Sequence, residues 1–146
     1  MAEAPRVLLV AAPFYEDITE ALLKGARAAL DAAGASHDTI MVPGAFEIPG
    51  AIALADAGEQ PYDAYVALGC VIRGETSHYD YVCGESARGL MELTLRGVAV
   101  GYGILTVENI LQARERAHVD KKDKGRDAAE AALAMASLRE RFGVQR

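Results

Sequence analysis

The chain has 146 residues, a length typical of one domain, and 51% hydrophobic residues exclude an intrinsically disordered protein. Fifteen Lys and Arg against 21 Asp and Glu give a net charge of −6, which argues against a nucleic-acid or anionic-membrane surface. An anionic small molecule stays possible, because an acidic protein can hold a local basic pocket. No apolar run is long enough to cross a bilayer, and the stretch from Val7 to Pro13 predicts a strand, not a signal peptide. We expect a cytoplasmic protein folded as one domain over residues 1–146.

Apolar strands alternate with helical patterns along the whole chain. In chain order we expect a strand over 6–12, a helix over 16–33, a strand over 39–42, a helix over 46–57, a strand over 64–72, a helix over 80–96, a strand over 98–105, and helices over 107–117 and 124–142. Gly34 and Gly97 are expected to end the first and third helices, and Thr106 to cap the fourth. This alternation predicts an α/β fold of three layers, with a parallel four-stranded sheet flanked by helices.

Ligands of such sheets bind beyond the carboxyl ends of the strands, so the residues that follow each strand are the candidates. The first strand is followed by Phe14 and Tyr15, which are either core side chains, the interpretation that position favours, or a stacking platform for a planar ligand. The second is followed by Glu47 in the first turn of a helix. Its carboxylate either stabilises the helix dipole or accepts hydrogen bonds from ligand hydroxyls.

The third strand is followed by the most informative stretch, Gly74 to Asp80. Ser77 and Asp80 have the spacing of a capping box, so the backbone N–H groups before this helix predict an anion site. His78 falls at the first helical position, where an imidazole beside an anion suits proton transfer. A lone histidine is nevertheless more often structural.

Basic residues follow the fourth strand, and the default interpretation is a solvated patch. They are Arg116, His118, Lys121, Lys122, Lys124 and Arg126. A helix of about ten residues is roughly 15 Å long, which would carry Arg116 to the opposite end of the sheet from Thr76 and His78. These residues are therefore either unrelated to the site or brought to it by a neighbouring subunit.

The two cysteines, Cys70 and Cys83, are in neither a CxxC pair nor zinc-ligand spacing with a histidine, so we expect free, buried or partly buried thiols and no metal site. The third strand ends Cys70-Val71-Ile72 and so lacks the acidic residue that a phospho-receiver domain needs there.

Three segments resemble the lumazine synthase family, whose full name is 6,7-dimethyl-8-ribityllumazine synthase. They are VPGAFEIP over 42–49, ALGCVIRGETSHYDYV over 67–82, and GILTVEN over 103–109, with Gln112, Ala113 and Arg116 beyond. The resemblance covers nearly the whole chain and implies a flavodoxin-like fold assembled as a homopentamer, in some members a decamer or capsid. It implies a transferase of riboflavin biosynthesis without metal or redox cofactor. The reaction condenses 5-amino-6-(D-ribitylamino)uracil with L-3,4-dihydroxy-2-butanone 4-phosphate to give 6,7-dimethyl-8-ribityllumazine, phosphate and water.

The resemblance also assigns roles to individual residues. Those of one subunit are the stacking ring Phe14, the ribityl contacts Phe46 and Glu47, the pyrimidine contacts Val71 and Ile72, the phosphate-binding turn Gly74, Glu75 and Thr76, and the proton-transfer residue His78. Those of the neighbouring subunit are the phosphate-binding Arg116, Lys124 and the aromatic wall Tyr102.

Three features depart from the family pattern. Tyr15 stands where many members have asparagine, Glu75 stands where alanine is common, and residues 117–125 lack the glycine-rich spacing of capsid-forming members. We therefore expect a pentamer or a decamer and no capsid.

The alternative function is a non-catalytic paralogue that binds flavin or lumazine. The presence of His78, Arg116 and Lys124 favours catalysis over that alternative.

Overall fold

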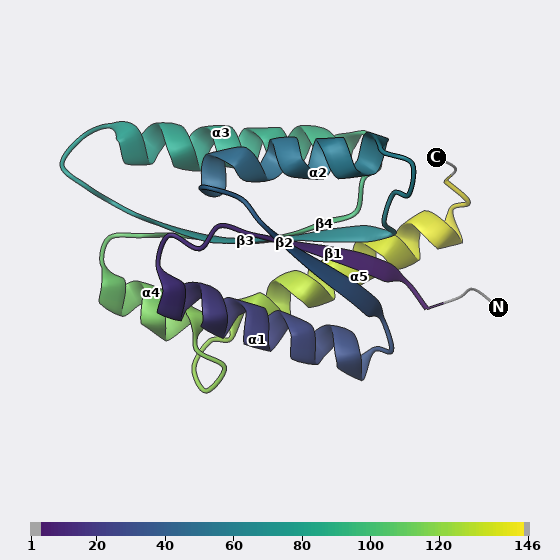
Figure 1. The fold of residues 1–146 in the computed structure, drawn as a ribbon, viewed down its shortest axis with the longest axis horizontal. Coiled ribbons are helices and arrows are strands. Elements are labelled where there is room, and N and C mark those ends of the chain that lie inside the picture. Colours follow the sequence, from purple (N-terminus) through teal and green to yellow (C-terminus); the bar gives the residue numbers. More distant parts are fainter. Residues whose placement is uncertain (1–3, 145–146) are drawn as a thin grey trace.

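The computed structural model describes residues 4–144 as a three-layer α/β fold (Figure 1). The strands are β1 (Arg6–Ala11), β2 (Ser36–Met41), β3 (Ala64–Ile72) and β4 (Val100–Val107). The helices are α1 (Glu16–Ala32), the 3₁₀ turn η1 (Ala45–Glu47), α2 (Ile48–Ala57), α3 (His78–Leu95), α4 (Ile110–Ala117) and α5 (Lys124–Arg141). The strands form one parallel sheet in the order β2-β1-β3-β4, which confirms the predicted fold class.

The sheet is covered on both faces, which explains the continuous apolar runs of its central strands. Helices α2 and α3 lie on one face, and α1, α4 and α5 lie on the other (Figure 1). Alternate residues of β1 face opposite layers. Val7 and Leu9 pack in the core beneath α1 and α5, while Leu8 and Val10 pack beneath α2 and α3. The strand order changes direction between β1 and β3, and ligands of such sheets bind at the carboxyl ends there.

Several element boundaries differ from those expected. Strand β2 begins at Ser36, three residues earlier than expected. Its residues are mostly half-buried or exposed, and an edge strand of this kind shows no continuous apolar run in the sequence. Thr106 lies inside β4 and caps no helix. The cap of α4 is Asn109, whose Oδ1 accepts a hydrogen bond from the Gln112 N–H at 2.9 Å. Gly34 and Gly97 follow α1 and α3 with φ of 74° and 92°, which confirms both predicted helix ends.

Helix α5 lies unusually close to its neighbours because glycines stand at the points of contact. A Cβ on Gly125 would meet the Leu22 backbone of α1, and a Cβ on Gly101 of β4 would meet the Ala128 backbone of α5. This packing fixes the start of α5, and therefore Lys124, against α1. No helix within residues 4–144 is both long and apolar enough to cross a bilayer.

Candidate active site

A cavity of about 540 Å³ lies beyond the carboxyl ends of β1 and β3. The residues that follow β1 and β2, the end of β3 and the start of α3 all line it. Six of the residues singled out in the sequence are brought together here: Phe14, Phe46, Glu47, Val71, Ile72 and His78. The lining is largely apolar with a few polar groups, as is typical of small-molecule sites.

Phe14 offers this cavity an aromatic surface. Its side chain is 73% exposed, and its ring meets the Tyr15 ring edge-on with centroids 4.9 Å apart. Tyr15, in contrast, packs against the core beneath α1. The core interpretation is therefore wrong for Phe14, because the chain turns into α1 with only Tyr15 directed inward. An exposed ring at this place can stack on a planar ligand.

Glu47 ends η1 and stands immediately before α2. Its backbone N–H donates to the Gly44 carbonyl at 3.1 Å, and the turn brings its carboxylate close to Gly44, where a Cβ would lie 3.2 Å from Oε1. Among residues 4–144, no hydrogen bond or ion pair engages the carboxylate of Glu47. Its oxygens can therefore accept hydrogen bonds from a ligand.

His78 is the first residue of α3, as predicted, and it lines the cavity. The predicted capping box is wrong. Ser77 has helical dihedral angles (φ −73°, ψ −1°), so its side chain makes no cap bond, while Asp80 pairs with Arg73 at 3.5 Å. The Thr76 hydroxyl instead accepts a hydrogen bond from the His78 N–H at 3.3 Å.

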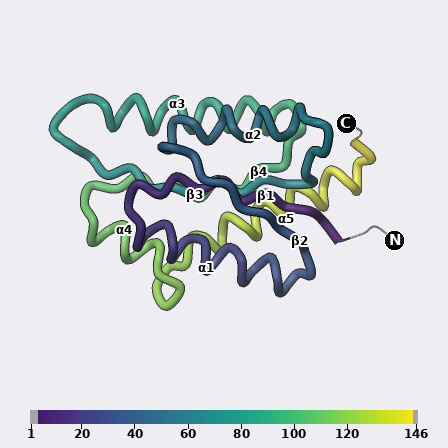
Figure 2. Tube along the Cα trace, viewed as in Figure 1, coloured from purple at the N-terminus to yellow at the C-terminus, as the bar shows by residue number. Residues whose placement is uncertain are grey.

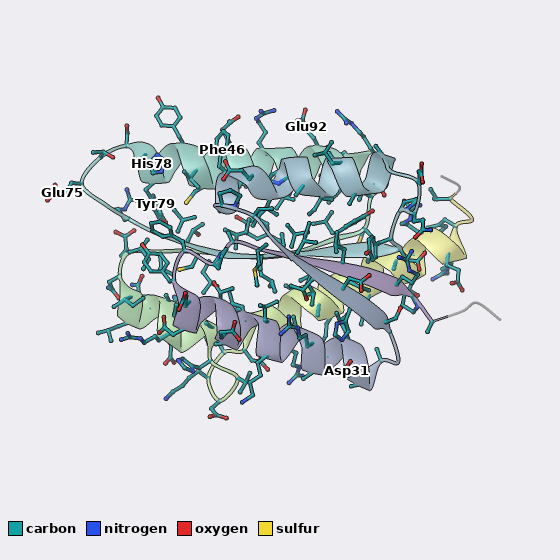
Figure 3. The ribbon with its side chains drawn as sticks, viewed as in Figure 1. Asp31, Phe46, Glu75, His78, Tyr79 and Glu92 are labelled. Carbon is teal, nitrogen blue, oxygen red and sulfur yellow. The ribbon has the colours of Figure 1, made fainter. Side chains whose placement is uncertain are left out.

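The loop from Gly74 to Ser77 extends beyond the end of the sheet before it returns into α3 (Figure 2). Its residues are exposed and do not line the cavity, although the Thr76 contact links the loop to His78. Glu75 lies at the tip, with its side chain directed away from His78 (Figure 3). The unusual carboxylate is therefore held away from the candidate site.

Tyr102, Arg116 and Lys124 do not reach the cavity of the same chain. Tyr102 is 45% exposed on the edge strand β4, and the Lys124 ammonium pairs with Asp127 at 3.3 Å. The Arg116 guanidinium donates to the Gln112 carbonyl within α4 at 3.1 Å.

The predicted location of Arg116 at the opposite end of the sheet is wrong. Helix α4 has eight residues, about 12 Å, and it begins at the carboxyl end of β4, so it never reaches the far end. Arg114 of α4 pairs at 3.4 Å with Asp17, which lies in the first turn of α1 after β1. Helix α4 thus lies at the same end of the sheet as the beginning of α3, but on the opposite face (Figure 1). It is the sheet that separates Arg116 from His78.

Seven further residues line the cavity, and two of them, Cys70 and Tyr15, carry titratable side chains to which the sequence assigns no role in binding or catalysis. Burial, with a smaller contribution from Asp17, raises the pKa of the Cys70 thiol to about 11, so it is protonated at neutral pH and a poor nucleophile. Both cysteines are free, as expected. Tyr15 follows β1 and Cys70 lies near the end of β3, and these positions at strand ends could have indicated that both residues line the cavity. Within residues 4–144, no group of three or more His, Cys, Asp or Glu side chains could hold a metal ion.

A flavodoxin-like sheet with a ligand-sized cavity at its switch point defines an α/β protein that binds small molecules. Comparison with known proteins gives the family. A sequence model of 6,7-dimethyl-8-ribityllumazine synthase matches residues 4–140, and the chain belongs to this family.

Similar curated proteins carry the same name. The 6,7-dimethyl-8-ribityllumazine synthase of Bartonella tribocorum is 59% identical, over 100% of this chain and 97% of its own. That of Sphingopyxis alaskensis is 60% identical, over 94% of this chain and 97% of its own. The protein named 6,7-dimethyl-8-ribityllumazine synthase 1 of Rhizobium meliloti is 54% identical, over 96% and 95%. The resemblance found in the sequence is thereby confirmed.

Proposed function

We propose that this chain is a transferase of riboflavin biosynthesis that makes 6,7-dimethyl-8-ribityllumazine. Its substrates would be 5-amino-6-(D-ribitylamino)uracil and L-3,4-dihydroxy-2-butanone 4-phosphate, with phosphate and water as the other products. The observation that carries the proposal is the convergence of an aromatic ring, a carboxylate and a histidine in one cavity of a chain that belongs to this family. We further propose that residues 1–146 form one domain that works in the cytoplasm, where Cys70 and Cys83 stay reduced.

The cavity would hold the pyrimidine substrate. The exposed ring of Phe14 would stack on the heterocycle, with Val71 and Ile72 beside it. The ribityl chain would run along Phe46 toward Glu47, whose carboxylate is open to accept hydrogen bonds from its hydroxyls. Gly74, Glu75 and Thr76 would bind the phosphate through backbone N–H groups before α3, where the helix dipole favours an anion.

The chemistry would need no covalent enzyme nucleophile, which agrees with a protonated Cys70. The 5-amino group of the pyrimidine attacks the ketone carbon, water leaves, and an imine forms. Loss of the C3 proton and of phosphate from C4 then leaves an enol, which tautomerises to a ketone at C3. Attack of the ribitylamino nitrogen on this new carbonyl closes the ring and releases a second water. His78 would move protons during imine formation and phosphate loss. Holding two substrates in register would supply much of the rate.

Arg116, Lys124 and Tyr102 would act in the cavity of a neighbouring copy, since none of them lines the cavity of their own. Eight of the large exposed apolar side chains support such an assembly, because they belong to elements at or next to the two edges of the sheet. Ile40, Met41, Phe46 and Leu54 lie on the β2 side, and Tyr81, Met91, Leu95 and Tyr102 belong to α3 and β4.

Two different surfaces that pair head to tail form a ring when the rotation between neighbouring copies closes. We propose a homopentamer, in which the number five rests on the family resemblance, and allow pairing of two rings into a decamer. Arg116 of one copy would then stabilise the departing phosphate in the next.

A direct assay tests the function. Purified protein with both substrates and a metal chelator should give a fluorescent lumazine, released with one phosphate per product. A protein that binds the pyrimidine or a flavin yet makes no lumazine would be the non-catalytic paralogue, and the proposal would fail.

A further inference from the structure

The loop that carries the proposed phosphate-binding turn is held mainly at one end. The Thr76 hydroxyl accepts the His78 N–H at 3.3 Å, and the Ser77 carbonyl accepts the N–H groups of Asp80 and Tyr81 at 3.0 and 3.3 Å. All of these bonds tie the end of the loop to the first turn of α3. Gly74, at its beginning, has open space where a side chain would stand. The start of the loop therefore needs another anchor.

Arg73, the residue immediately before Gly74, provides that anchor. Its Nε lies 3.0 Å from both carboxylate oxygens of Glu108, and its Nη1 lies 3.5 Å from Asp80. Its guanidinium carbon lies 4.3 Å from the centre of the Tyr79 ring. One side chain thus joins the start of the loop to the first turn of α3 and to the connection between β4 and α4.

The partner of Arg73 is itself fixed. The N–H of Glu108 donates to Gln112 Oε1 at 2.7 Å, so the Gln112 side chain of α4 fixes the backbone of Glu108. The Arg73 N–H also donates to the Val107 carbonyl at 2.9 Å, which extends the β3–β4 pairing to the last residue before the loop. Arg73 therefore spans two rigid elements.

We propose that Arg73 is a positioning residue that, through Glu108 and Asp80, holds the Gly74–Thr76 turn in the geometry that binds the substrate phosphate. This proposal rests on the proposed function for the identity of the phosphorylated ligand. A turn fixed before binding pays no ordering cost when the ligand arrives, so the effect falls on phosphate affinity.

Arg73 is not itself placed to bind the phosphate. Its guanidinium faces two carboxylates and covers the Tyr79 ring, so an anion at the same place would meet the negative charges of Glu108 and Asp80. Lysine cannot replace it fully, because a point charge cannot span carboxylates and an aromatic face together.

Steady-state kinetics of Arg73→Ala, Glu108→Ala and the double variant test the proposal, with Arg27→Ala as the control. Arg27 is a half-buried arginine of α1 that donates to Thr39 at 3.1 Å, away from the cavity. We expect Arg73→Ala to raise KM for the butanone phosphate about two- to fivefold and to leave KM for the pyrimidine nearly unchanged. Glu108→Ala should do the same, the double variant should be no worse than either, and Arg73→Lys should recover part of the loss.

Two results would overturn the proposal: an equal rise in both KM values, or losses that multiply in the double variant. Thermal unfolding of each variant keeps a folding defect separate, and Arg73→Lys stays informative if Arg73→Ala does not fold. Titration with inorganic phosphate by calorimetry needs no turnover. If the wild type makes no lumazine but binds phosphate more tightly than Arg73→Ala, the synthase proposal fails while the role of Arg73 stands. If lumazine forms and phosphate affinity does not change, the reverse holds.

Discussion

Gly125, the second residue of α5, lies against the backbone of α1, and we predict that Gly125→Ala forces the two helices apart. An added Cβ would lie 2.8 Å from the Leu22 carbonyl carbon, 2.9 Å from its Cα and closer still to its carbonyl oxygen. These are backbone atoms of a helix, which cannot rotate away as a side chain can. The two helices must therefore separate by on the order of 1 Å, since packed interiors hold no spare room.

The cost follows from two opposing effects. Overpacking of this kind costs about 1–3 kcal/mol. Alanine favours the helix over glycine by up to about 1 kcal/mol, which offsets part of it. We expect a net loss of about 1–2 kcal/mol, which for a chain of this length lowers Tm by about 2–8 °C. Because Lys124 precedes Gly125, activity should also fall.

The assay is thermal unfolding by circular dichroism at one fixed protomer concentration, since assembly alters apparent stability. The wild type, measured at the same protomer concentration, is the reference. If Gly125→Ala unfolds no earlier than the wild type, the account of the α1–α5 packing is wrong.

Three further predictions concern the site. Arg116→Ala should raise KM for the butanone phosphate about 10- to 100-fold, because a charged hydrogen bond is worth about 1.5–3 kcal/mol, and should affect the pyrimidine little; equal losses would contradict its role. Phe14→Ala should weaken the pyrimidine about three- to tenfold, the value of one stacked pair, while Phe14→Tyr should keep its affinity; an unchanged affinity in Phe14→Ala would exclude stacking. In Cys83→Ser protein, labelling of Cys70 by iodoacetamide should be slow at neutral pH and rise toward pH 11, because burial raises the thiol pKa; a plateau near pH 8 would be inconsistent with it.

The fold could be predicted from the sequence because buried parallel strands leave a plain signal. Strand β3 is apolar throughout, and its apolar run predicts the observed bounds, Ala64–Ile72. The apolar pattern predicts the start of β2 three residues late, because the exposed Ser36 and the half-buried His37 of this edge strand continue no apolar run. The sequence predicts the wrong start for α4, because Thr106 and Asn109 are both common N-cap residues. Only the structure shows that the Asn109 side chain makes the cap.

The cavity residues could be predicted from the strand exits, whereas the contacts among polar side chains could not. The spacing of Ser77 and Asp80 is that of a capping box, but Arg73 attracts the Asp80 carboxylate and the turn takes another form. Strand order alone does not predict how far α4 extends along the sheet. In the structure the sheet itself, and not the length of α4, separates Arg116 from His78 (Figure 1). Such contacts depend on side-chain geometry that no spacing rule contains.

Mixing two impaired variants tests most directly whether the site is shared between copies. His78→Ala and Arg116→Ala subunits would be unfolded together in equal amounts and refolded into mixed rings. The rings would be assayed at a butanone phosphate concentration far below the KM of Arg116→Ala, where each variant alone makes little lumazine. A site is intact when one copy keeps His78 and its neighbour keeps Arg116, so random mixing should restore about one half times one half, or about a quarter, of wild-type lumazine synthesis. No recovery in rings whose mixing has been proven by mass spectrometry would contradict a site formed between subunits.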